Sequence, residues 1–516
     1  MLNIAAHLQR SAALTPCKVA IHCGDRTLSY GQLDGAANQV ANALRRLGVG
    51  RGDRVVLACP NLPEFPIVYY GILKAGAIVV PINALLKAPE IAEHLRESQA
   101  RAFFCFEGSA EGPLHREGWK GHVEAATGAA FVMITADPHE PSAIAGARTL
   151  GELMRAESPA GDYAPMQETD TAVILYTSGT TGRSKGAELT HSNLALNIAY
   201  AALMCKMDAA DTHLIALPLF LAFGQTTQMN AAILVGATMV LMPRFDADGA
   251  LALMERHGVT IFAGVPTMYI ALLNLAGAAQ AHDLGKIAAR LRLTLSGGSA
   301  MPVAVLSAFE ERFGAPVLEG YGLAETSPVA SFNFLDSERL PASVGKPLYG
   351  VEIKLVDRAG RTVAIGETGE IAIRGHNVTK GYFNRPEATA QAIVDGWLHT
   401  GDVGRIDDSG SLFIVDRVTD MIIRGGFNVY PRELEEVLMT HPAVAQAAVV
   451  GVPHATHGEE VKAVLVLEAG AATTPEAIVE WCRERMAGYK YPRVVEIVAG
   501  MPTTATGKII KRDLRA

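Results

Sequence analysis

Short runs of β-forming residues alternate with helical runs along most of the chain, and this order limits the fold more than any other feature. Residues 54–58 indicate a strand, 66–74 a helix and 77–80 the next strand. The same alternation continues to about residue 320. It is typical of βα units that build mostly parallel sheets, so we predict an α/β fold. Residues 107–130 are polar and rich in glycine, and we expect a surface excursion there.

The pattern of elements changes near Val344, where short strands separated by glycine turns indicate a small antiparallel unit. From about Thr419 a compact tail of mixed helices and strands follows. A chain of 516 residues is also too long for one ordinary core. We therefore predict a large N-terminal domain over residues 1–416, with a β-rich subdomain at about 344–416, a hinge at 417–420 and a small mobile α+β C-terminal domain at 421–516.

Composition narrows the class of protein. The chain is 49% hydrophobic and 19% charged, which is typical of a globular protein. Its formal net charge of −8 argues against broad binding to nucleic acids or anionic membranes. The six cysteines show no metal-ligand spacing, so we expect reduced thiols and a cytoplasmic location. No apolar run approaches the ~18 residues of a membrane span, and the start lacks the pattern of a signal peptide.

Residues 176–186 form a loop with three glycines, five Ser or Thr hydroxyls and one lysine, Lys185. An apolar run at 172–175 precedes it and a helix-like run at 192–204 follows, so we place the loop between a buried strand and a helix. Glycines let backbone N–H groups surround an anion, and a lysine adds a mobile positive charge. The sequence therefore predicts a phosphate-binding loop, with a flexible linker as the alternative. The loop does not match the Walker P-loop pattern.

Further motifs follow this loop in a fixed order. They are EGYGLAET at 319–326, GEIAIRG at 369–375, GY at 381–382, RPE at 385–387, WLHTGD at 397–402, DR at 416–417, GGFNVYP at 425–431 and PTTATGK at 502–508. Together with the loop they resemble the adenylate-forming superfamily, which includes acyl- and aryl-CoA synthetases, the adenylation domains of peptide synthetases and beetle luciferases. The resemblance covers nearly the whole chain. It implies that ATP and a carboxylate form an acyl-adenylate, from which a thiol displaces AMP.

The resemblance implies that several of these motifs bind ATP or AMP. The residues that would hold the β- and γ-phosphates are Thr177, Ser178, Gly179, Thr180, Thr181, Gly182 and Lys185. Tyr321 and the backbone of the 297–299 turn would enclose the adenine, and Asp402 would accept hydrogen bonds from the ribose beside Arg417. Taken singly, Tyr321 also fits a core position and Asp402 a turn cap. The remaining nucleotide contacts would come from Gly298, Ser299, Gly320, Gly322 and Thr326.

The resemblance also assigns the chemistry. With Lys185, the catalytic groups would be Glu325, which would coordinate Mg²⁺, and Lys508, which would bridge the acyl carboxylate and the α-phosphate. The alternative for both is a solvated surface side chain. Thioester formation would need the C-terminal domain to turn about Thr419, so that Gly425 and Gly426 line the channel for CoA.

Three positions depart from the usual pattern of the superfamily. Thr419 stands where an Asp or Lys is common at the hinge. Leu221 takes the place of a histidine after an aromatic residue, which puts its gating role in doubt or transfers it to Phe220 or Phe223. Ala324 replaces a Thr or Ser, so we expect one hydrogen bond to be missing. None of these departures removes a catalytic group.

The side chains that we expect to line the acyl pocket are mostly apolar or small. Its residues are Phe220, Ala222, Phe223, Gln225, Val265, Gly297 and Ala324. They include no cation for a second carboxylate and no acid for an amino group, which disfavours diacids and amino acids. We therefore favour a medium- or long-chain fatty acid, with an aryl or cinnamate-type acid, or loading of a carrier protein, as alternatives. ATP, Mg²⁺ and coenzyme A are the expected cofactor and co-substrates, and a homodimer is a general expectation.

Overall fold

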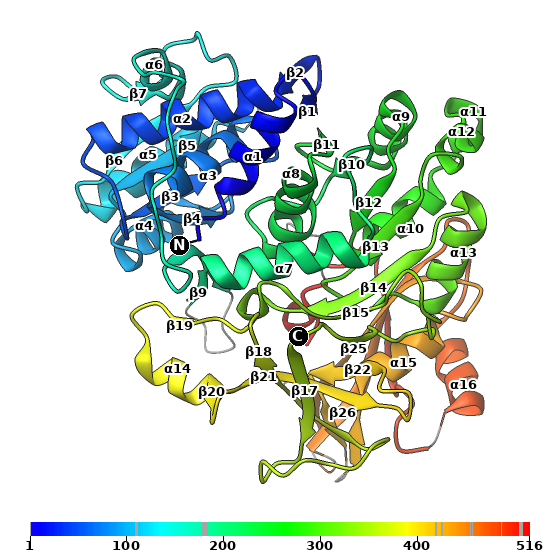
Figure 1. The fold of residues 1–516 in the computed structure, drawn as a ribbon. Helices are drawn as coiled ribbons and strands as arrows, with labels where there is room; N and C mark the ends of the chain where they lie inside the picture. Colours follow the sequence, from blue (N-terminus) through cyan, green and yellow to red (C-terminus); the bar gives the residue numbers. More distant parts are fainter. Residues whose placement is uncertain are drawn as a thin grey trace.

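The computed structural model describes residues 2–108, 112–177, 184–417, 420–424, 427–454, 456, 458–486, 488–504 and 509–515. Two large sheets and two smaller ones make up the fold (Figure 1). Strands and helices alternate through both large sheets, and their central strands run parallel. The predicted α/β fold is therefore confirmed.

The first large sheet has the strand order β19-β9-β8-β4-β3-β5-β6-β7. From β8 to β7 neighbouring strands run parallel, whereas β9 is antiparallel to β8 and β19 is antiparallel to β9. The strands are β3 (Arg54–Ala58), β4 (Ile78–Ile82), β5 (Ala102–Phe106), β6 (Ala130–Ile134), β7 (Arg148–Thr149), β8 (Thr171–Thr177), β9 (Lys185–Thr190) and β19 (Gly381–Tyr382). Strand β19 thus returns to this sheet from a distant part of the sequence.

The second large sheet has the order β16-β15-β14-β13-β12-β10-β11-β1-β2. Its strands are parallel from β14 to β1, and antiparallel pairs close both edges. The strands are β1 (Val19–Cys23), β2 (Arg26–Ser29), β10 (Thr212–Ile215), β11 (Thr238–Leu241), β12 (Ile261–Gly264), β13 (Leu293–Ser296), β14 (Val317–Gly322), β15 (Val329–Phe332) and β16 (Lys346–Pro347).

Helices cover these sheets, and α7 runs across the middle of the molecule in Figure 1. The N-terminus of α7 is stabilised by a capping box, in which the Thr190 side chain accepts a hydrogen bond from Asn193 N and the Asn193 side chain accepts one from Thr190 N. The helices are α1 (Ala6–Leu14), α2 (Tyr30–Arg46), α3 (Glu64–Ala75), α4 (Ala88–Glu97), α5 (Leu114–Ala125), α6 (Leu150–Arg155), α7 (His191–Met204), α8 (Ala231–Val235), α9 (Ala247–His257), α10 (Pro266–Asn274), α11 (Ala278–Ala281), α12 (Leu284–Ala288), α13 (Val303–Phe313) and α14 (Pro386–Ala392).

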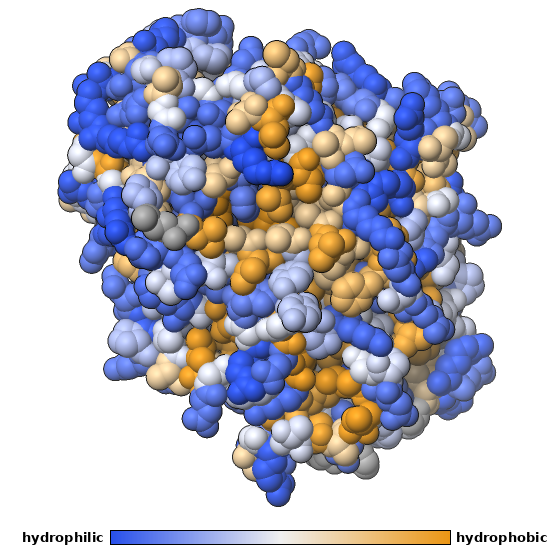
Figure 2. Space-filling view, in the orientation of Figure 1, coloured by the Kyte–Doolittle hydropathy of each residue, from blue (hydrophilic) through white to orange (hydrophobic). Residues whose placement is uncertain are grey.

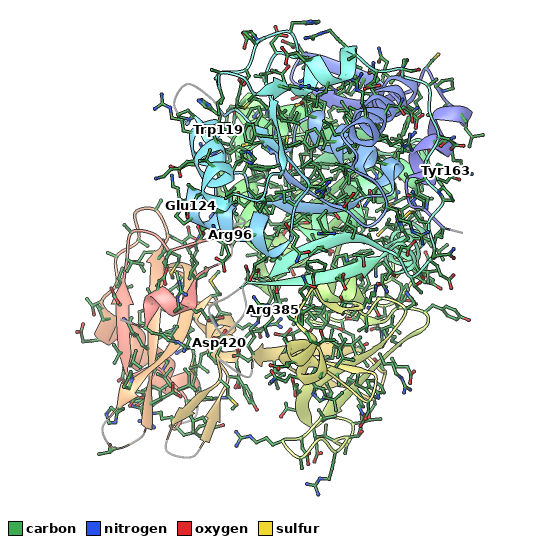
Figure 3. All side chains as sticks on the ribbon, turned by 90° about the vertical axis from the view of Figure 1, so that its left-hand side faces the viewer. Arg96, Trp119, Glu124, Tyr163, Arg385 and Asp420 are labelled. Carbon is green, nitrogen blue, oxygen red and sulfur yellow. The ribbon has the colours of Figure 1, made fainter. Side chains whose placement is uncertain are left out.

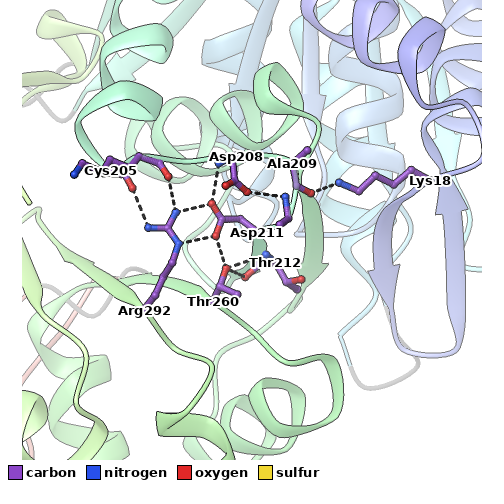
Figure 4. A network of polar contacts seen from close by, with 10 residues as sticks. Lys18, Cys205, Asp208, Ala209, Asp211, Thr212, Thr260 and Arg292 are labelled. Carbon is purple, nitrogen blue, oxygen red and sulfur yellow. Dashed lines mark hydrogen bonds and ion pairs between the residues drawn. The ribbon is translucent and has the colours of Figure 1, made fainter.

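A polar network fixes the edge of the second sheet at which its parallel strands begin (Figure 4). Arg292, just before β13, donates to both carboxylate oxygens of Asp211, just before β10, at 2.8 and 2.6 Å. The same guanidinium donates to the Cys205 and Lys206 carbonyls beyond α7, and Thr260 donates to Asp211 at 2.7 Å. Burying a charge is favourable only when it is paired and hydrogen-bonded, as it is here. The network leaves the opposite, carboxyl edge of the strands to the functional motifs.

The two smaller sheets follow in the sequence. The β-rich sheet is antiparallel, as predicted, and consists of β17 (Val351–Val356), β18 (Thr368–Gly375), β20 (Ile393–Val394), β21 (Trp397–Ile406) and β22 (Leu412–Arg417). The C-terminal sheet consists of β23 (Ile422–Arg424), β24 (Phe427–Val429), β25 (Val444–His454), β26 (Gly458–Leu467) and β27 (Val494–Ile497), with helices α15 (Pro431–Leu438) and α16 (Pro475–Arg485). This C-terminal part has a hydrophobic core of its own and stands beside the N-terminal part in Figure 3, where Asp420 marks the junction. The hinge at 417–420 stays a prediction.

The segment 107–130, expected as a surface excursion, contains helix α5, of which only Gly118, Gly121 and Ala125 are buried. Its glycines are there for packing. A Cβ atom on Gly118 would lie 2.3 Å from the Cys105 Sγ atom of β5, and one on Gly121 would lie 2.7 Å from the Ala88 carbonyl of α4. Glycine is unfavourable inside most helices, but here it lets the helix approach its neighbours closely.

The position of the phosphate-type loop also needs correction. The structure inserts strand β9 between the loop and α7, and β9 pairs antiparallel with β8. The loop therefore joins two strands of one sheet, and Lys185 is the first residue of the second strand. Loop residues 178–183 lie outside the described residues.

Apolar side chains gather across the middle of one face, where Figure 1 places α7 (Figure 2). On this helix Leu203 is 70% exposed and Leu196 is 38% exposed. Within the described part of the chain, no helix combines the length and hydropathy needed to cross a membrane.

Candidate active site

Three residues from two sheets meet around the Asp402 carboxylate. The Tyr321 Oη atom of β14 donates to Asp402 Oδ2 at 2.7 Å, and Arg417 Nε lies 3.0 Å from Asp402 Oδ1. Asp402 and Arg417 face each other directly in the register of β21 and β22. The Asp402 side chain is only 6% exposed, whereas that of Arg417 is 46% exposed. The sequence named all three residues, and the fold brings them together with a cationic group open to solvent.

Burial and the charge of Asp402 raise the pKa of Tyr321 well above its usual value. The phenol therefore stays protonated and donates to the carboxylate throughout the physiological range. This bond holds the tyrosine ring in a fixed position at the end of β14.

The 297–299 turn lies beside this group because of strand order. It follows β13, Tyr321 lies near the end of β14, and the two strands are parallel neighbours in which Ser296 pairs with Glu319. The carboxyl ends of adjacent parallel strands meet at one edge, which is where open α/β sheets bind ligands. Gly298 has a φ of +81° and is exposed, as is Ser299. Such a φ is strained for other residues and turns the backbone outward at this edge.

A second group surrounds Tyr382, to which the sequence analysis assigned no role. Tyr382 Oη donates to Glu325 Oε1 at 2.9 Å, and the Lys185 Nζ atom lies 5.2 Å from the centroid of the Tyr382 ring. Burial and the Glu325 charge raise the pKa of this phenol as well. The GY motif at 381–382 was the available signal, but a single tyrosine does not reveal what it touches. Thr177 Oγ1 donates to the Lys185 carbonyl at 3.4 Å, so it lies at the base of the same loop.

Three other residues that were predicted to contact the nucleotide have packing roles of their own. The Thr326 hydroxyl is buried, accepts from Leu323 N at 2.8 Å and donates to the Pro328 carbonyl. A Cβ atom on Gly320 would lie 2.5 Å from the Phe332 ring, and one on Gly322 would lie 1.8 Å from the Pro328 carbonyl. These residues shape the turn that carries Glu325, and their contacts with a nucleotide stay predictions.

The residues expected in the acyl pocket divide into two groups. The Phe223 ring lies against Gly297, where an added Cβ atom would approach it to 3.0 Å, and a Cβ atom on Gly298 would lie 3.5 Å from Val265 Cγ1. These side chains cover the turn next to Tyr321.

Gln225 belongs to the protein interior. It is fully buried, its amide nitrogen donates to the Leu219 carbonyl at 3.2 Å, and its oxygen accepts from Tyr69 Oη at 3.3 Å. Ala222 is also buried, Phe220 is half-buried, and Ala324 begins the short 3-10 helix η2 (Ala324–Thr326). Phe223 opens a π-helix, η1 (Phe223–Asn230).

Several predicted residues lie outside the described part of the chain, namely Ser178, Gly179, Thr180, Thr181, Gly182, Thr419, Gly425, Gly426 and Lys508. Their neighbours are described. Arg432 N of α15 donates to Asp416 Oδ2 at 3.2 Å, and Arg515 Nη2 donates to Asp420 Oδ1 at 3.2 Å. The start of α15 therefore packs on the end of β22, one residue from Arg417.

Glu319 is a buried acid close to this junction. It is 4% exposed, Met301 N donates to it at 3.4 Å, and burial raises its pKa to about 7, with Arg432 opposing the shift. The unfolded chain ionises near 4.5, so the free energy of unfolding should fall as the pH rises from about 4.5 to about 7.

Glu319→Gln removes this pH dependence and keeps an acceptor for Met301. The free energy of unfolding of the variant minus that of the parent should therefore increase from about pH 5 to about pH 8, by up to about 3 kcal/mol. Urea unfolding at both pH values measures this gain. An equal difference at the two pH values would contradict the raised pKa.

No cluster of three or more His, Cys, Asp or Glu side chains within the described residues could hold a metal ion. Magnesium does not need such a cluster, since it often binds one or two carboxylates together with substrate phosphates and water. A lone carboxylate such as Glu325, near Lys185 and the predicted phosphate loop, is compatible with that mode.

The site can be compared with known proteins. A family model described as AMP-binding enzyme matches residues 8–383, and one described as AMP-binding enzyme C-terminal domain matches residues 433–508. A long-chain-fatty-acid–CoA ligase of Bacillus subtilis (strain 168) is 36% identical over 530 residues, which cover 98% of this chain and 93% of the relative. A feruloyl-CoA synthase of an Amycolatopsis species is 36% identical over 509 residues, which cover 98% and 97%.

The structure of an anthranilate–CoA ligase in complex with anthranoyl-AMP has a TM-score of 0.91 to this chain at 32% identity, and the match covers 99% of this chain and 96% of the other. The family models match both the large N-terminal part and the C-terminal part. The chain therefore belongs to the AMP-binding enzyme family and is an acid–thiol ligase of its adenylate-forming, acyl-CoA synthetase branch.

Proposed function

We propose that this enzyme converts a medium- or long-chain fatty acid into its CoA thioester in two steps. The carboxylate attacks the α-phosphate of ATP, forming acyl-AMP and releasing pyrophosphate. The CoA thiol then attacks the acyl carbon, so that AMP leaves and the thiol proton passes to solvent. The observation that carries this proposal is the assembly of Tyr321, Asp402 and Arg417 at the carboxyl edge of the second sheet, beside the 297–299 turn.

The arrangement suits a nucleoside monophosphate. The exposed Gly298 and Ser299 backbone and the fixed Tyr321 ring would enclose the base, while Asp402 and Arg417 would contact the ribose. Gly320, Gly322 and Thr326 would hold the turn in shape. Binding of this kind supplies position more than chemistry, as is typical of phosphoryl transfer.

The phosphates would lie toward β9. Lys185, Thr177 and the loop at 178–182 would bind the β- and γ-phosphates, and Glu325 would bind Mg²⁺ together with phosphate oxygens. When bound, the metal would neutralise charge on the phosphates. Lys508 would contact the acyl carboxylate and the α-phosphate, where negative charge grows in the transition state.

The second step would use the C-terminal part differently. Rotation about the 417–420 segment would remove Lys508 and bring Gly425 and Gly426 to the channel for CoA. The contact of Arg432 with Asp416 crosses this segment and would then have to change, which gives the rotation an identifiable polar contact to break.

The fatty-acid reading rests on the apolar surroundings of Gly297 and on the Bacillus relative. The amide of Gln225 is engaged inside the core and offers no group for a polar substrate. An aryl acid is the second candidate, because a flat ring would also fit against Phe223 and Gly297, and relatives named for ferulate and anthranilate are comparably similar.

AMP and pyrophosphate release with a panel of acids tests both candidates. The panel should contain octanoate, palmitate, benzoate, 4-coumarate and ferulate, each with and without CoA. Turnover of the fatty acids above the aryl acids, dependent on CoA, is the expected result. Preference for an aryl acid would replace the substrate class, and CoA-independent arrest at acyl-AMP would favour a carrier protein as acceptor. No product with any acid would overturn the proposed function.

A further inference from the structure

Tyr382 stands between two groups of opposite charge that the proposed function uses together. Its hydroxyl donates to Glu325 Oε1 at 2.9 Å, and its ring faces the Lys185 ammonium at 5.2 Å. One side chain therefore contacts both the expected magnesium ligand and the expected phosphate-binding lysine. The sequence motifs did not indicate these contacts of Tyr382.

The backbone around Tyr382 is fixed to the elements that carry both partners. Strand β19 pairs with β9, where Tyr382 faces Ala187, and Phe383 N donates to the Gly186 carbonyl at 2.8 Å. On the other side, Thr379 N donates to the Glu325 carbonyl at 2.7 Å. The short segment 379–383 thus connects the strand of Lys185 with the turn of Glu325.

A second anchor holds this segment from outside. Arg385, labelled in Figure 3, forms an ion pair with Glu97 at the end of α4. Thr379 Oγ1 also donates to the Glu188 carbonyl of β9 at 2.7 Å. The backbone is held at several points, so the position of the tyrosine side chain is defined. The side chain can therefore hold both of its partners in place.

The physical consequence is separation of charge. A lysine and a glutamate on adjacent elements attract each other, and a direct ion pair would turn both away from a ligand. The aromatic ring offers the ammonium a face of negative potential, and the hydroxyl offers the carboxylate a donor. Each charge is satisfied without meeting the other.

We infer that Tyr382 is a positioning residue, which holds Glu325 and Lys185 apart so that they bind the magnesium ion and the pyrophosphate part of ATP together. This inference rests on the proposed function and adds a residue to it. It predicts that loss of the hydroxyl affects metal dependence, and that loss of the ring affects nucleotide affinity in addition.

The test uses the full-length protein with Tyr382→Phe and Tyr382→Leu. ATP binding is measured by calorimetry across a range of Mg²⁺ concentrations without acid, which requires no turnover. Tyr382→Phe should raise the Mg²⁺ concentration for half-maximal binding about tenfold, and Tyr382→Leu should also weaken ATP binding at saturating Mg²⁺ about tenfold. Tyr70→Phe, which removes a buried hydroxyl bonded to Asn230 at 2.7 Å, is the matched control and should leave both quantities unchanged.

A double-mutant cycle separates positioning from general loss of structure. In Glu325→Gln, adding Tyr382→Phe should change the Mg²⁺ dependence no further, because the hydroxyl acts through the carboxylate. Additive effects, or parental Mg²⁺ dependence in Tyr382→Phe, would overturn the inference. Thermal unfolding shows whether Tyr382→Phe folds. If it does not fold, Glu325→Gln alone tests the inference, and parental Mg²⁺ dependence in that variant would overturn it.

The proposed function fails separately, if the parent protein binds Mg²⁺ and ATP but releases no AMP with any acid. When turnover is present, Tyr382→Phe should change the KM for ATP at limiting Mg²⁺ and leave the KM for the acid unchanged. Conversion of supplied acyl-AMP and CoA should also stay at the parental rate, because it needs neither pyrophosphate nor its metal.

Discussion

Lys508→Ala is expected to lower the rate of acyl-adenylate formation about 10²–10³-fold, which is the cost of losing a donor aimed at transition-state charge. The conversion of supplied acyl-AMP and CoA into thioester should stay near the parental rate. The reason is that the lysine would contact the carboxylate and the α-phosphate only while the adenylate forms. Pyrophosphate release measures the first step, and thioester formation from synthetic acyl-AMP measures the second.

Lys511→Ala is the matched control for Lys508→Ala. Lys511 lies close by in the sequence, and its ammonium pairs with Glu435 at 2.8 Å inside the C-terminal part. Its loss should affect both steps alike through stability. If Lys508→Ala also reduced both steps equally, the proposal that the C-terminal domain takes a different position in each step would be wrong.

Asp402→Ala is expected to raise the KM for ATP about 10²-fold and to weaken AMP binding by a similar factor. Two effects add here. A carboxylate hydrogen bond to a ribose contributes about 1.5–3 kcal/mol, and the truncation also leaves the buried Tyr321 hydroxyl and Arg417 without the acceptor that now holds them. Calorimetric titration with AMP measures the affinity directly, and steady-state kinetics give the KM.

Glu352→Ala in the same β-rich sheet separates this effect from a general change of the sheet. Glu352 pairs with Arg374 at 2.8 Å, but its side chain is 60% exposed, so its loss should be nearly neutral. Parental AMP affinity in Asp402→Ala would remove the ribose role. It would leave Asp402 as a structural partner of Tyr321 and Arg417.

Local pattern was a good guide wherever one element could be recognised alone. Helix α3 covers the predicted range 66–74, and Gly76 adopts a left-handed conformation just after its end. Strand β3 matches its predicted range 54–58, because its apolar run is buried. Residues with two uses were a poorer guide, such as the glycines of α5, which are typical of turns in general but here allow close packing.

Relations between distant segments could not be read in the same way. The pairing of β19 with β9 joins residues about two hundred positions apart in the sequence, and hydropathy does not encode which edge a two-residue strand will choose. Tyr382 was therefore missed, although its motif was visible. Gln225, in contrast, was assigned to the acyl pocket from its place in the sequence. The structure shows that its amide forms hydrogen bonds inside the core.

By itself, the sequence determined the α/β class, the order of the motifs and the identity of Tyr321, Asp402 and Arg417 as candidate site residues, because glycine turns, buried runs and charged side chains are local chemistry. Only the tertiary structure decided that Tyr321 and Arg417 share the Asp402 carboxylate, and that Tyr382 separates Lys185 from Glu325. The physical reason is that a hydrogen bond or a cation–π contact requires a defined distance and direction between side chains. Those are set by how strands from different sheets meet, and no single segment of sequence contains them.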